Sequence, residues 1–575
     1  MHNTAAPWLD SSGPLPVNQR LRRLTFLQCL CLLTCFWLGG CASLPDEVDR
    51  PVSTALASNA STRLGQAVAD RAATAGTHND SGFAIVGSAE LAFTSRMTLI
   101  KAAQKTLDLQ YYAIHLDDTT ERMFDALREA AGRGVRIRIL LDDFNTAGKN
   151  AQVLKLAFEK NIEVRLFNPL PSGRASPFFR ILSSLNDIAR IQRRMHNKIF
   201  VADNAVAITG GRNLGDTYFG QSTGANFVDI DLLAAGRIAR DLSGSFDQYW
   251  NNPLAYPAQS LMTVQDIEAI KSQTSVRFMD KPRSAEGDFP LPPAEPDETN
   301  APNKTSFTRV TTSPNGDTST IAALPDSTNL RLLKWTWAPS VMLVDKPSKI
   351  AADADSVEQS QDTAVDGLLQ LMAQAKSDLL IVSPYFVPGQ VMMKQFADIR
   401  KRGVRVRVLT NSLASNDAPA AHAGYARYRQ ALLDMGIEIY EMRAEQQGSM
   451  SSFGSATGST GRSTGASRAS LHAKVVVIDN NLLVVGSMNL DLRSKLQNSE
   501  VAIVIRNRAL AAEATRMIEP GLATDAYRVD QVGGQLVWRA PQKSGLNDVS
   551  VEPDASLSLR LMIKIIAPFA PDEML

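Results

Sequence analysis

The same pattern of polar residues occurs twice in this chain of 575 residues, and this repetition constrains the fold more than any other feature. Both copies read H-x-K-x4-D-x6-G-[GS]-x-N, and their histidines, His196 and His472, stand 276 positions apart. The polar and small residues of the two copies are His196, Lys198, Asp203, Gly211 and Asn213, and then His472, Lys474, Asp479, Ser487 and Asn489. Two complete copies indicate an internal duplication.

A second pair of segments repeats at nearly the same spacing. Residues 134–143 and 403–411 each begin with glycine and continue as an apolar strand pattern, at an offset of 269 residues. The patterns that precede them are a strand and a helix in each half, over 107–114 and 120–132 and over 379–386 and 392–402. Strand, helix and strand in that order predict a duplicated α/β fold, in which each half holds a mixed, largely parallel sheet flanked by helices.

The spacing within the motif is that of a strand, a turn and a returning strand. Side chains two residues apart share a face of a strand, so we expect His196 and Lys198 to project together. Asp203 falls where the turn begins, and the next apolar stretch returns the small residues and the asparagine to the same end. Small residues there let a ligand approach the backbone closely. The residues we predict to bind a phosphate are Gly211, Asn213, Ser487 and Asn489.

Two histidine–lysine pairs suit chemistry on a phosphodiester. One imidazole can attack phosphorus, and the other can protonate the leaving alkoxide and then deprotonate the incoming hydroxyl. The lysines supply the positive charge that the phosphate needs, so the sequence predicts no metal ion and no other cofactor. The residues we assign to the catalytic motif are His196, Lys198, Asp203, His472, Lys474 and Asp479, of which the two aspartates are expected to hold the architecture of the site.

Composition excludes several classes of protein. The formal net charge is +1, from 60 basic and 59 acidic residues, so nucleic acid is not the expected partner. All four cysteines lie between residues 29 and 41, which excludes a disulfide framework or a cysteine-based metal site in the main body.

The N-terminal segment has the pattern of a targeting signal. Arg20, Arg22 and Arg23 precede an apolar run over 24–38, which ends in Leu-Gly-Gly-Cys41. This ending resembles the lipobox of bacterial lipoproteins, which implies lipidation of Cys41. An uncleaved transmembrane anchor is the alternative, although the run is short for a membrane-spanning helix. Both interpretations place the body of the protein at a membrane of the bacterial cell envelope, on its non-cytoplasmic side.

Composition shifts divide the rest of the chain. We expect a tether over 42–81 that includes an early helix, and a first half over 82–280. A linker or irregular excursion follows over 281–325, and then the second half over 326–510, with a flexible Gly/Ser insertion at 448–470. The C-terminal segment, 511–575, contains an apolar stretch at 557–569, which fits a membrane interface or a core helix equally well.

The two motifs resemble the HKD signature of the phospholipase D superfamily, and the likeness spans residues 82–506. Within it, the chain is most similar to bacterial cardiolipin synthases, particularly the C type. The segments that carry this likeness are 110–112, 193–198, 210–216, 421–429 and 491–494. The resemblance implies one active site shared between the halves, with His196 as the nucleophile and His472 as the general acid and base. The two motifs are symmetric enough in sequence to allow the reverse assignment. It also implies that Asp231 and Glu500 orient the histidines.

The resemblance further implies a function. Cardiolipin synthases transfer a phosphatidyl group from a donor phospholipid to phosphatidylglycerol, so the expected substrates are phospholipids at a membrane. The donor is left open between phosphatidylethanolamine and phosphatidylglycerol. The alternatives are a hydrolytic phospholipase D, a nuclease with the same site, and a lipid-binding lipoprotein whose site is retired. His422 stands in a segment that could face a lipid headgroup, and Tyr425, Arg427 and Arg429 could bind a second phosphate or form a solvated helix face.

Overall fold

The computed structural model describes residues 44–77, 79–146, 148–170, 188–222, 224–262, 308–312, 318–322, 324–325, 327–351, 362–446, 467–569 and 572. Residues 45–575 form one compact unit, and the two halves of the chain lie within it. Cys41 and the rest of the predicted signal segment fall outside the described residues.

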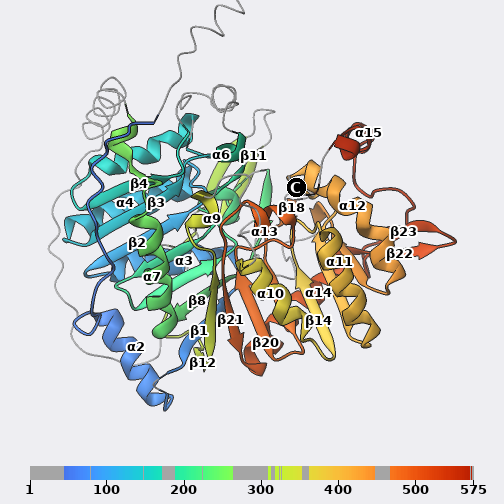
Figure 1. Cartoon of the computed structure of the whole chain (residues 1–575), viewed down its shortest axis with the longest axis horizontal. Helices are drawn as coiled ribbons and strands as arrows, with labels where there is room; N and C mark the ends of the chain where they lie inside the picture. The colour runs from blue at the N-terminus through green and yellow to red at the C-terminus, as the bar shows by residue number, and fades with distance from the viewer. Residues whose placement is uncertain are drawn as a thin grey trace, which may run out of the picture. The chain divides into compact units, whose positions relative to one another are not determined.

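The first half is built on a nine-stranded sheet with the strand order β12-β1-β8-β6-β5-β2-β3-β4-β9 (Figure 1). Its strands are β1 (Ser81–Val86), β2 (Thr106–Tyr111), β3 (Arg136–Asp142), β4 (Ile162–Phe167), β5 (Ile199–Ala202), β6 (Val206–Gly210), β8 (Asp231–Ala235), β9 (Ala255–Pro257) and β12 (Thr336–Ala338). Its larger helices are α2 (Arg63–Thr74), α3 (Ala89–Ala102), α4 (Asp118–Gly132) and α7 (Arg237–Trp250).

The second half has a sheet of order β13-β21-β20-β19-β14-β15-β16-β22-β23. Eight strands, β13 to β22 in that order, repeat β1 to β9 of the first sheet, whereas β12 and β23 are additions at opposite edges. Its strands are β13 (Ser340–Val344), β14 (Asp378–Val382), β15 (Arg405–Asn411), β16 (Glu438–Met442), β19 (Val475–Ile478), β20 (Leu482–Gly486), β21 (Val501–Arg506), β22 (Ala526–Val532) and β23 (Gln535–Arg539). Its helices are α10 (Ala364–Ala373), α11 (Gly389–Lys401), α12 (Pro419–Asp434), α13 (Leu492–Leu496), α14 (Arg508–Thr524) and α15 (Leu557–Ile566).

The duplicated mixed α/β fold is confirmed, but parallel pairing is less extensive than the prediction of largely parallel sheets. It is confined to β2–β3–β4 in the first sheet and β14–β15–β16 in the second. All other neighbouring strands in these two sheets are antiparallel. The reason is local: each motif forms a tight hairpin, and only the segments that cross over through a helix, such as α4, can return parallel.

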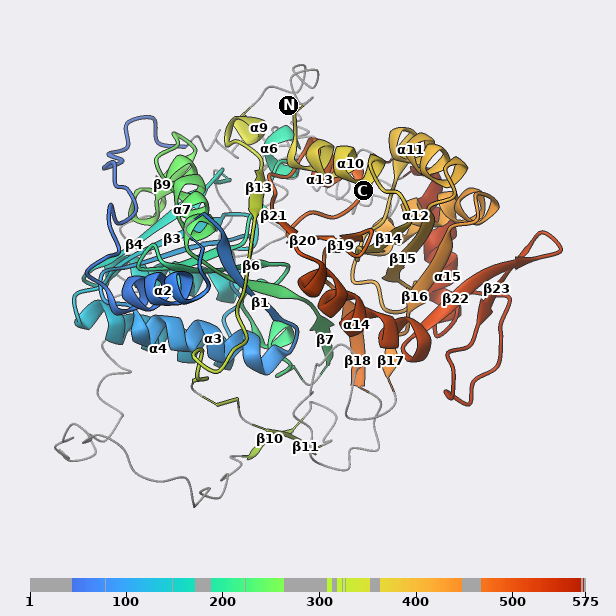
Figure 2. The ribbon, with the colours of Figure 1, turned by 90° about the horizontal axis from the view of Figure 1, so that it is seen from below.

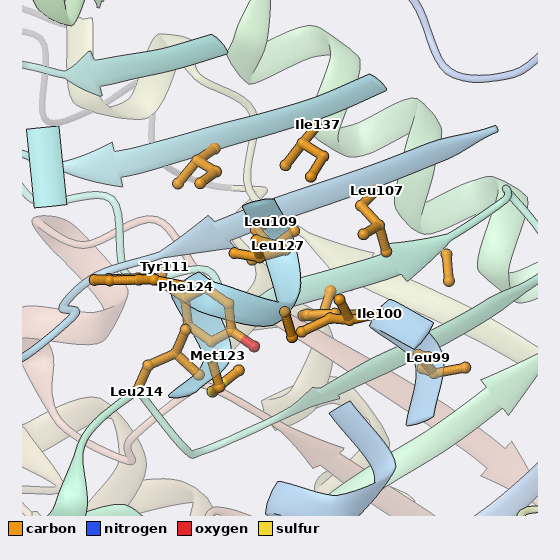
Figure 3. Packing of buried hydrophobic residues seen from close by; sticks show 14 of the residues in the cluster. Leu99, Ile100, Leu107, Leu109, Tyr111, Met123, Phe124, Leu127, Ile137 and Leu214 are labelled. Carbon is orange, nitrogen blue, oxygen red and sulfur yellow. The ribbon is translucent and has the colours of Figure 1, made fainter. Parts of the chain in front are cut away.

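Helices cover the outer face of each sheet, as Figure 2 shows for α3 and α4. Asp117 caps α4 by accepting a hydrogen bond from the amide of Thr120, which fixes where this helix begins. The packing in Figure 3 explains why these segments are apolar at helical spacing. Here the strand residues Leu107, Leu109 and Ile137 meet the helix residues Leu99, Ile100, Met123, Phe124 and Leu127.

The inner faces of the two sheets share one core. This cluster of buried residues combines Ile199, Val201 and Ala207 of the first sheet with Val475, Val477 and Val485 of the second. Helices α7 and α14 contribute to the same core through Leu242 and Ile518. Burial on both faces explains why the motif strands are almost continuously apolar. The common core also holds the two motifs in a fixed relation.

Three predicted boundaries need correction. Residues 44–62 are not a free tether, because the amide of Ser53 donates to Asn251 and Arg138 donates to the carbonyl of Ser53. The predicted linker contains a hairpin of β10 (Thr308–Thr312) and β11 (Thr318–Ala322). The predicted C-terminal segment is part of the second half up to residue 539, because α14, β22 and β23 complete that sheet and its core.

The Gly/Ser insertion is also shorter than predicted at its C-terminal end. Residues 467–471 form β18 (Ser467–Leu471), which pairs with β17 (Glu445–Gln446) and with β7 (Ala225–Val228) of the first half. The insertion at 448–466 lies outside the described residues. Among the helices that are described, none is both long enough and apolar enough to cross a membrane.

Candidate active site

Each motif forms a tight β-hairpin. β5 and β6 are joined by residues 203–205, and β19 and β20 by residues 479–481. The central positions of the two turns are Asp203, Asn204, Asp479 and Asn480, because the amides of Ala205 and Asn481 close the turns onto Ala202 and Ile478. All four residues have a positive φ, between 45° and 52°. Positive φ at both central positions is the signature of a type I′ turn, whose twist matches that of the strands. Aspartate and asparagine tolerate this conformation better than most residues, which explains the residue types at the turn.

The two motif aspartates lie at the far end of these hairpins from the histidines. Asp203 accepts hydrogen bonds from the amides of Gln104, Lys105 and Thr106, at 2.7–3.1 Å. Asp479 accepts the equivalent bonds from residues 376–378. They therefore hold the architecture, as expected, by tying each hairpin to the start of β2 or β14. Their inclusion in the catalytic set is wrong if that set means groups that touch the reacting atoms.

The backbone of each histidine is hydrogen-bonded to the opposite half. The amide of His196 donates to the carbonyl of Ser499 at 2.9 Å, and the amide of His472 donates to the carbonyl of Val228 at 2.8 Å. The residue that follows Ser499 is Glu500, and the residue that follows Val228 is Asp229. The main chain thus brings an acidic residue of one half beside the histidine of the other.

The side chains complete this exchange. Glu500 accepts from Nδ1 of His196, with both oxygens at 3.0 Å, and Asp229 accepts from Nδ1 of His472 at 2.7 Å. All four side chains are at least nine-tenths buried. An acceptor on Nδ1 fixes the proton there and leaves Nε2 as the basic nitrogen of the ring. Each histidine is therefore oriented by a carboxylate from the other half.

The predicted role of Asp231 is wrong, whereas the predicted contact of Glu500 with a histidine is present. Asp231 pairs with Arg96 at 2.9 Å and with Arg212 at 3.4 Å, and all three are buried in the first half. Asp229, which sequence reasoning passed over, holds His472 instead. The strand register gives the reason. The equivalent motif glycines Gly210 and Gly486 pair with Asp231 and Ala502, so Asp231 corresponds to Ala502. Glu500 lies two residues before Ala502, and its counterpart therefore lies two residues before Asp231.

The small residues of the motif make room for these carboxylates. A Cβ atom on Gly211 would lie 2.3 Å from an oxygen of Asp229, which excludes any side chain there. Ser487 donates its hydroxyl to Glu500 and its amide to the carbonyl of Val501. The hydroxyl and the amide of Ser487 are thus occupied by the protein, and both small residues support the two acids. The predicted phosphate contact of Gly211 and Ser487 stays a prediction.

The two motif asparagines differ from one another. Asn213 accepts from the amide of Ala113 at 3.3 Å and donates to the hydroxyl of Tyr218 at 2.9 Å. Asn489 is equally buried, but its side-chain oxygen has no hydrogen-bond partner among the described residues. A buried amide oxygen without a partner is costly. The unpartnered atom is an acceptor, so it can take a hydrogen bond from a hydroxyl group but not from a phosphate oxygen. The predicted phosphate contact stays a prediction for both asparagines.

The two lysines lie buried beside their histidines. Nζ of Lys198 donates to the carbonyl of His196 at 2.9 Å, and Nζ of Lys474 donates to that of His472 at 2.5 Å. Burial lowers the pKa of Lys198 to about 7, against the opposing influence of Glu500, and it also lowers the pKa of Lys474. An anion between them would restore their charge, so the pair is arranged to receive a phosphate.

The acids that hold the histidines are in different electrostatic states. Burial raises the pKa of Glu500 to about 7, although Lys198 opposes this shift. Burial also acts to raise the pKa of Asp229, but the hydrogen bond from His472 and the nearby cations outweigh it and leave that pKa below its ordinary value. Burial and the two lysines lower the pKa of His196 well below its usual range, and burial and Lys474 lower the pKa of His472.

Several residues at the site were missed by sequence reasoning. The ring of Tyr112 meets that of His196 edge-on at 5.1 Å, and the rings of Tyr218 and Phe227 lie 5.3 and 4.9 Å from that of His472. Arg493 is close enough to act on the pKa of His196. Tyr112 and Arg493 lie in segments that resemble the family, so the sequence pointed to these segments but did not indicate what the two residues do.

The cluster around His422 does not reach this site. His422 is fully buried and contacts Glu552 at 3.3 Å and Arg429 at 3.2 Å. Tyr425 is buried and donates to Glu441, while Arg427 pairs with Asp572. The interpretations as a headgroup contact or a second phosphate site are therefore wrong, and of the three residues considered for a solvated face only Arg427 is exposed. These side chains join α12 to the C-terminal segment.

The arrangement supports acid–base and nucleophilic chemistry on a phosphate. Two imidazoles with free Nε2 atoms, two lysines and a nearby arginine converge on one buried place. Within the described residues, no group of three or more His, Cys, Asp or Glu side chains could hold a metal ion.

Comparison with known proteins shows the family of this chain. The protein-family profile described as "Cardiolipin synthase, PLD-like domain" matches residues 97–250 and 368–520, which contain the two motifs. Cardiolipin synthase C of Escherichia coli (strain K12) is 33% identical over 492 residues, covering 84% of this chain and 94% of that protein. A cardiolipin synthase of Geobacillus kaustophilus is 23% identical over 419 residues, covering 73% of this chain and 61% of that protein.

A solved structure confirms the fold. The crystal structure of phosphatidylserine synthase from Haemophilus influenzae Rd KW20 matches with a TM-score of 0.52 over 88% of this chain and 98% of that chain, at 13% identity. The family profile matches two regions that each contain one motif, and Cardiolipin synthase C is matched over nearly its full length. Together these matches establish the family. The chain belongs to the phospholipase D-like family of cardiolipin synthases.

Proposed function

We propose that this protein is a phosphatidyltransferase that makes cardiolipin by moving a phosphatidyl group from a donor phospholipid to phosphatidylglycerol. The observation that carries the proposal is that each histidine is hydrogen-bonded by a carboxylate of the opposite half. These contacts orient Nε2 of both His196 and His472 within one buried, cationic site. Family membership supports phospholipids as the substrates.

The proposed reaction has two displacements at phosphorus. Nε2 of His196 attacks the phosphorus of the donor and forms a phosphohistidine, while Nε2 of His472 gives its proton to the oxygen of the departing alcohol. In the second step His472 takes the proton of a hydroxyl of phosphatidylglycerol, and that oxygen attacks phosphorus and displaces His196. The enzyme returns to its starting protonation state, and the donor alcohol is released.

The unequal acids support this division of roles. A nucleophile must be a neutral imidazole, and Glu500, whose pKa is raised to about 7, does little to stabilise a charged His196. A general acid must carry a proton, and Asp229, whose pKa stays low, is a full anion that stabilises a protonated His472. The electrostatics favour His196 as nucleophile and His472 as acid and base.

Three cations are placed to hold the phosphate. Lys198 and Lys474 are the buried pair, and Arg493 is partly exposed nearby. Among the described residues, the guanidinium of Arg493 makes no hydrogen bond or ion pair. A trigonal-bipyramidal phosphorane carries more negative charge on its oxygens than the bound diester does, so fixed cations stabilise the transition state more than the ground state.

The test is lipid analysis of cells that lack their own cardiolipin synthases and produce either the wild type or His196→Ala. Cardiolipin formed only with the wild type supports transfer. Loss of that cardiolipin in a host without phosphatidylethanolamine identifies the donor, and its persistence identifies phosphatidylglycerol. Accumulation of phosphatidic acid without cardiolipin would sink the synthase proposal and leave a hydrolase on the same residues.

We also propose that the protein works at a membrane surface of the cell envelope, anchored through lipid on Cys41. The Leu-Gly-Gly-Cys sequence supports the anchor. Release of the protein from membranes by Cys41→Ser, with loss of incorporated labelled palmitate, is the expected result. Retention of Cys41→Ser on membranes without any lipid label would favour an uncleaved N-terminal helix instead.

Helix α15 supports the same location. Its outer face presents Leu557, Leu561 and Ile565, which are 58–81% exposed, together with the exposed Lys564. Its inner face packs through Ile563 on a cluster that includes Leu413, which follows the end of β15. An apolar helix face with a basic residue suits the interface of a membrane. We expect Leu561→Ser with Ile565→Ser to weaken sedimentation with phospholipid vesicles, whereas unchanged sedimentation would exclude this helix from the contact.

A further inference from the structure

A cavity of about 630 Å³ lies in the first half, away from the histidines. It is enclosed by α2, the end of α3, the turns that begin β2 and β3, and the segment 328–337. Residues of α2 and of α3 line it together, and Figure 2 shows how these two helices lie in the fold. Its volume is within the range of sites that bind small molecules.

The cavity and the active site are at opposite ends of the first sheet. The cavity is lined by Gln104 and Val135, which precede β2 and β3, and by Val206 at the start of β6. Tyr112 and Asn213, which belong to the active site, follow the other ends of β2 and β6. A strand of six residues spans about 20 Å. A molecule bound in this cavity would therefore not occupy the catalytic centre.

The interior of the cavity is apolar. Val135 and Val206 are buried at its base, and Leu64 and Val68 of α2 form one wall. Trp335 lies in the opposite segment, where its ring nitrogen donates to the carbonyl of Leu330. Such a surface gains free energy by excluding water, at about 25 cal/mol per Å² of apolar area. The interior therefore suits a hydrocarbon chain better than a polar molecule.

The charged residues of the lining all have the same sign. They are Arg63, Arg71, Lys101, Arg133 and Arg331, and no aspartate or glutamate is among the lining residues. Arg71 and Arg133 are held by backbone carbonyls, those of Arg331 and Ile100 respectively. In the part of the chain that the structure describes, the guanidinium groups of Arg63 and Arg331 make no hydrogen bond or ion pair. The like charges of Arg63 and Arg331, which have no counter-ion among the described residues, favour an anionic ligand.

We propose that this cavity binds an anionic membrane phospholipid, with one acyl chain against Val135 and Val206 and the phosphate at Arg63 and Arg331. The combination of an apolar interior and a cationic rim matches an amphiphile, and neither free phosphate nor a neutral lipid satisfies both parts. The binding site is separate from the transferase site and does not depend on which reaction that site catalyses.

Two tryptophans at the cavity allow a direct test on the full-length protein. Trp335 and Trp337 line it, and the described tryptophans elsewhere, Trp250 and Trp538, are buried. Tryptophan fluorescence is followed while lysophosphatidylglycerol with a brominated acyl chain is added below its micelle concentration. Lysophosphatidylcholine with the same brominated chain is the matched neutral probe. We expect saturable quenching, at least about tenfold tighter for the anionic probe, which corresponds to about 1.4 kcal/mol.

Variants then locate the bound lipid. Arg63→Glu with Arg331→Glu should weaken the anionic probe at least about tenfold, since it replaces both free cations by anions. Arg508→Glu with Arg516→Glu, two exposed arginines of α14, is the matched control with the same change of charge and should bind normally. Ala67→Phe, at an exposed position of α2, should fill the cavity and weaken both probes. Trp335→Phe with Trp337→Phe should remove most of the quenching.

Three outcomes would overturn the proposal. Equal affinity for the two probes would remove the role of the cations, and quenching that survives Trp335→Phe with Trp337→Phe would place the lipid elsewhere. Displacement of the probe by glycerol 3-phosphate at the same concentration would show that the acyl chain is not needed, and would assign the cavity to a soluble phosphate. Circular dichroism of each variant establishes that it is folded, so that a loss of binding can be interpreted.

Discussion

The two halves of this protein share eight equivalent strands in one order and the same motif, yet they are built differently around it. In the first half the motif glycine Gly211 leaves space for Asp229, and in the second half Ser487 hydrogen-bonds the longer Glu500. The acids are equivalent in register but differ in charge, since the pKa of Glu500 is raised to about 7 and that of Asp229 is lowered. The duplicated strands thus place the two histidines in equivalent positions, but the acids beside them differ in pKa.

The interior beneath the motifs also differs between the halves. The first half buries an ionic cluster of Arg96, Asp231 and Arg212. The amides of Gln104 and Lys376, which bind Asp203 and Asp479, are 272 positions apart, so Leu368 is the counterpart of Arg96. The strand register makes Ala502 the counterpart of Asp231 and Met488 that of Arg212. All three counterparts lie in an apolar core. The same backbone therefore accepts either a paired charge cluster or hydrocarbon at this place. The difference teaches that the charges of the cluster are not required by the fold itself.

The largest expected effect comes from removing either histidine. His196→Ala and His472→Ala should each lower kcat by at least about 10⁴-fold, because both act in both steps. The variants should nevertheless differ in chemistry. With a radiolabelled phosphatidyl donor, only His472→Ala should accumulate any labelled protein, because it keeps the nucleophile. Label on His196→Ala alone would reverse the assignment of the two roles.

Replacing Asp229 and Glu500 by their amides should show that the two carboxylates contribute unequally to catalysis. We expect Asp229→Asn to lower kcat by about 10²–10⁴-fold, since His472 loses both its orientation and the anion that stabilises its charged form. Glu500→Gln should have a smaller effect near pH 7, because the carboxyl group is already partly protonated there. Steady-state rates of both variants against the wild type measure this ratio. Equal losses at pH 7 would contradict the electrostatic difference between the two sites.

The buried ionic cluster should affect stability more than catalysis. Asp231→Ala leaves Arg96 and Arg212 buried without their counter-ion, which should cost about 3–5 kcal/mol of unfolding free energy. Arg96→Leu, which introduces the residue of the second half, should restore part of that loss when combined with Asp231→Ala. Denaturant unfolding of the single and double variants tests this coupling. If the double variant is as unstable as the sum of the two single variants, the cluster is not coupled.

The smallest effect is a pH dependence set by Lys198. Its pKa is lowered to about 7, so the free enzyme should lose this cation as the pH rises through that value. In the proposed mechanism this cation holds the phosphate, so kcat/KM should fall above pH 7, by about tenfold per pH unit at most. Lys198→Arg keeps its charge and should move this limb to higher pH, even if its activity is lower. An unchanged limb in Lys198→Arg would assign it to another group.

Much of the architecture could be predicted from local patterns. The apolar periodicity of residues 107–143 gives a strand, a helix and a parallel strand, and these became β2, α4 and β3. The turn at Asp203 and the hairpin of each motif could also be predicted. In each motif two apolar stretches with the two-residue period of a strand are separated by a few polar residues, and all of these are neighbours in sequence. Parallel pairing was over-predicted, because a strand pattern carries no information about the direction of its partner.

What the sequence alone determined was the duplication, the two histidine–lysine pairs and the chemistry that they can perform. Only the tertiary structure decided which acid serves which histidine, because those contacts join residues 243 and 304 positions apart in the chain. No local period links such positions, and Asp229 and Asp231 are both acids on neighbouring stretches of chain. The register of β6 against β8, together with the core shared by the two sheets, places Asp229 at His472 and leaves Asp231 to the arginines.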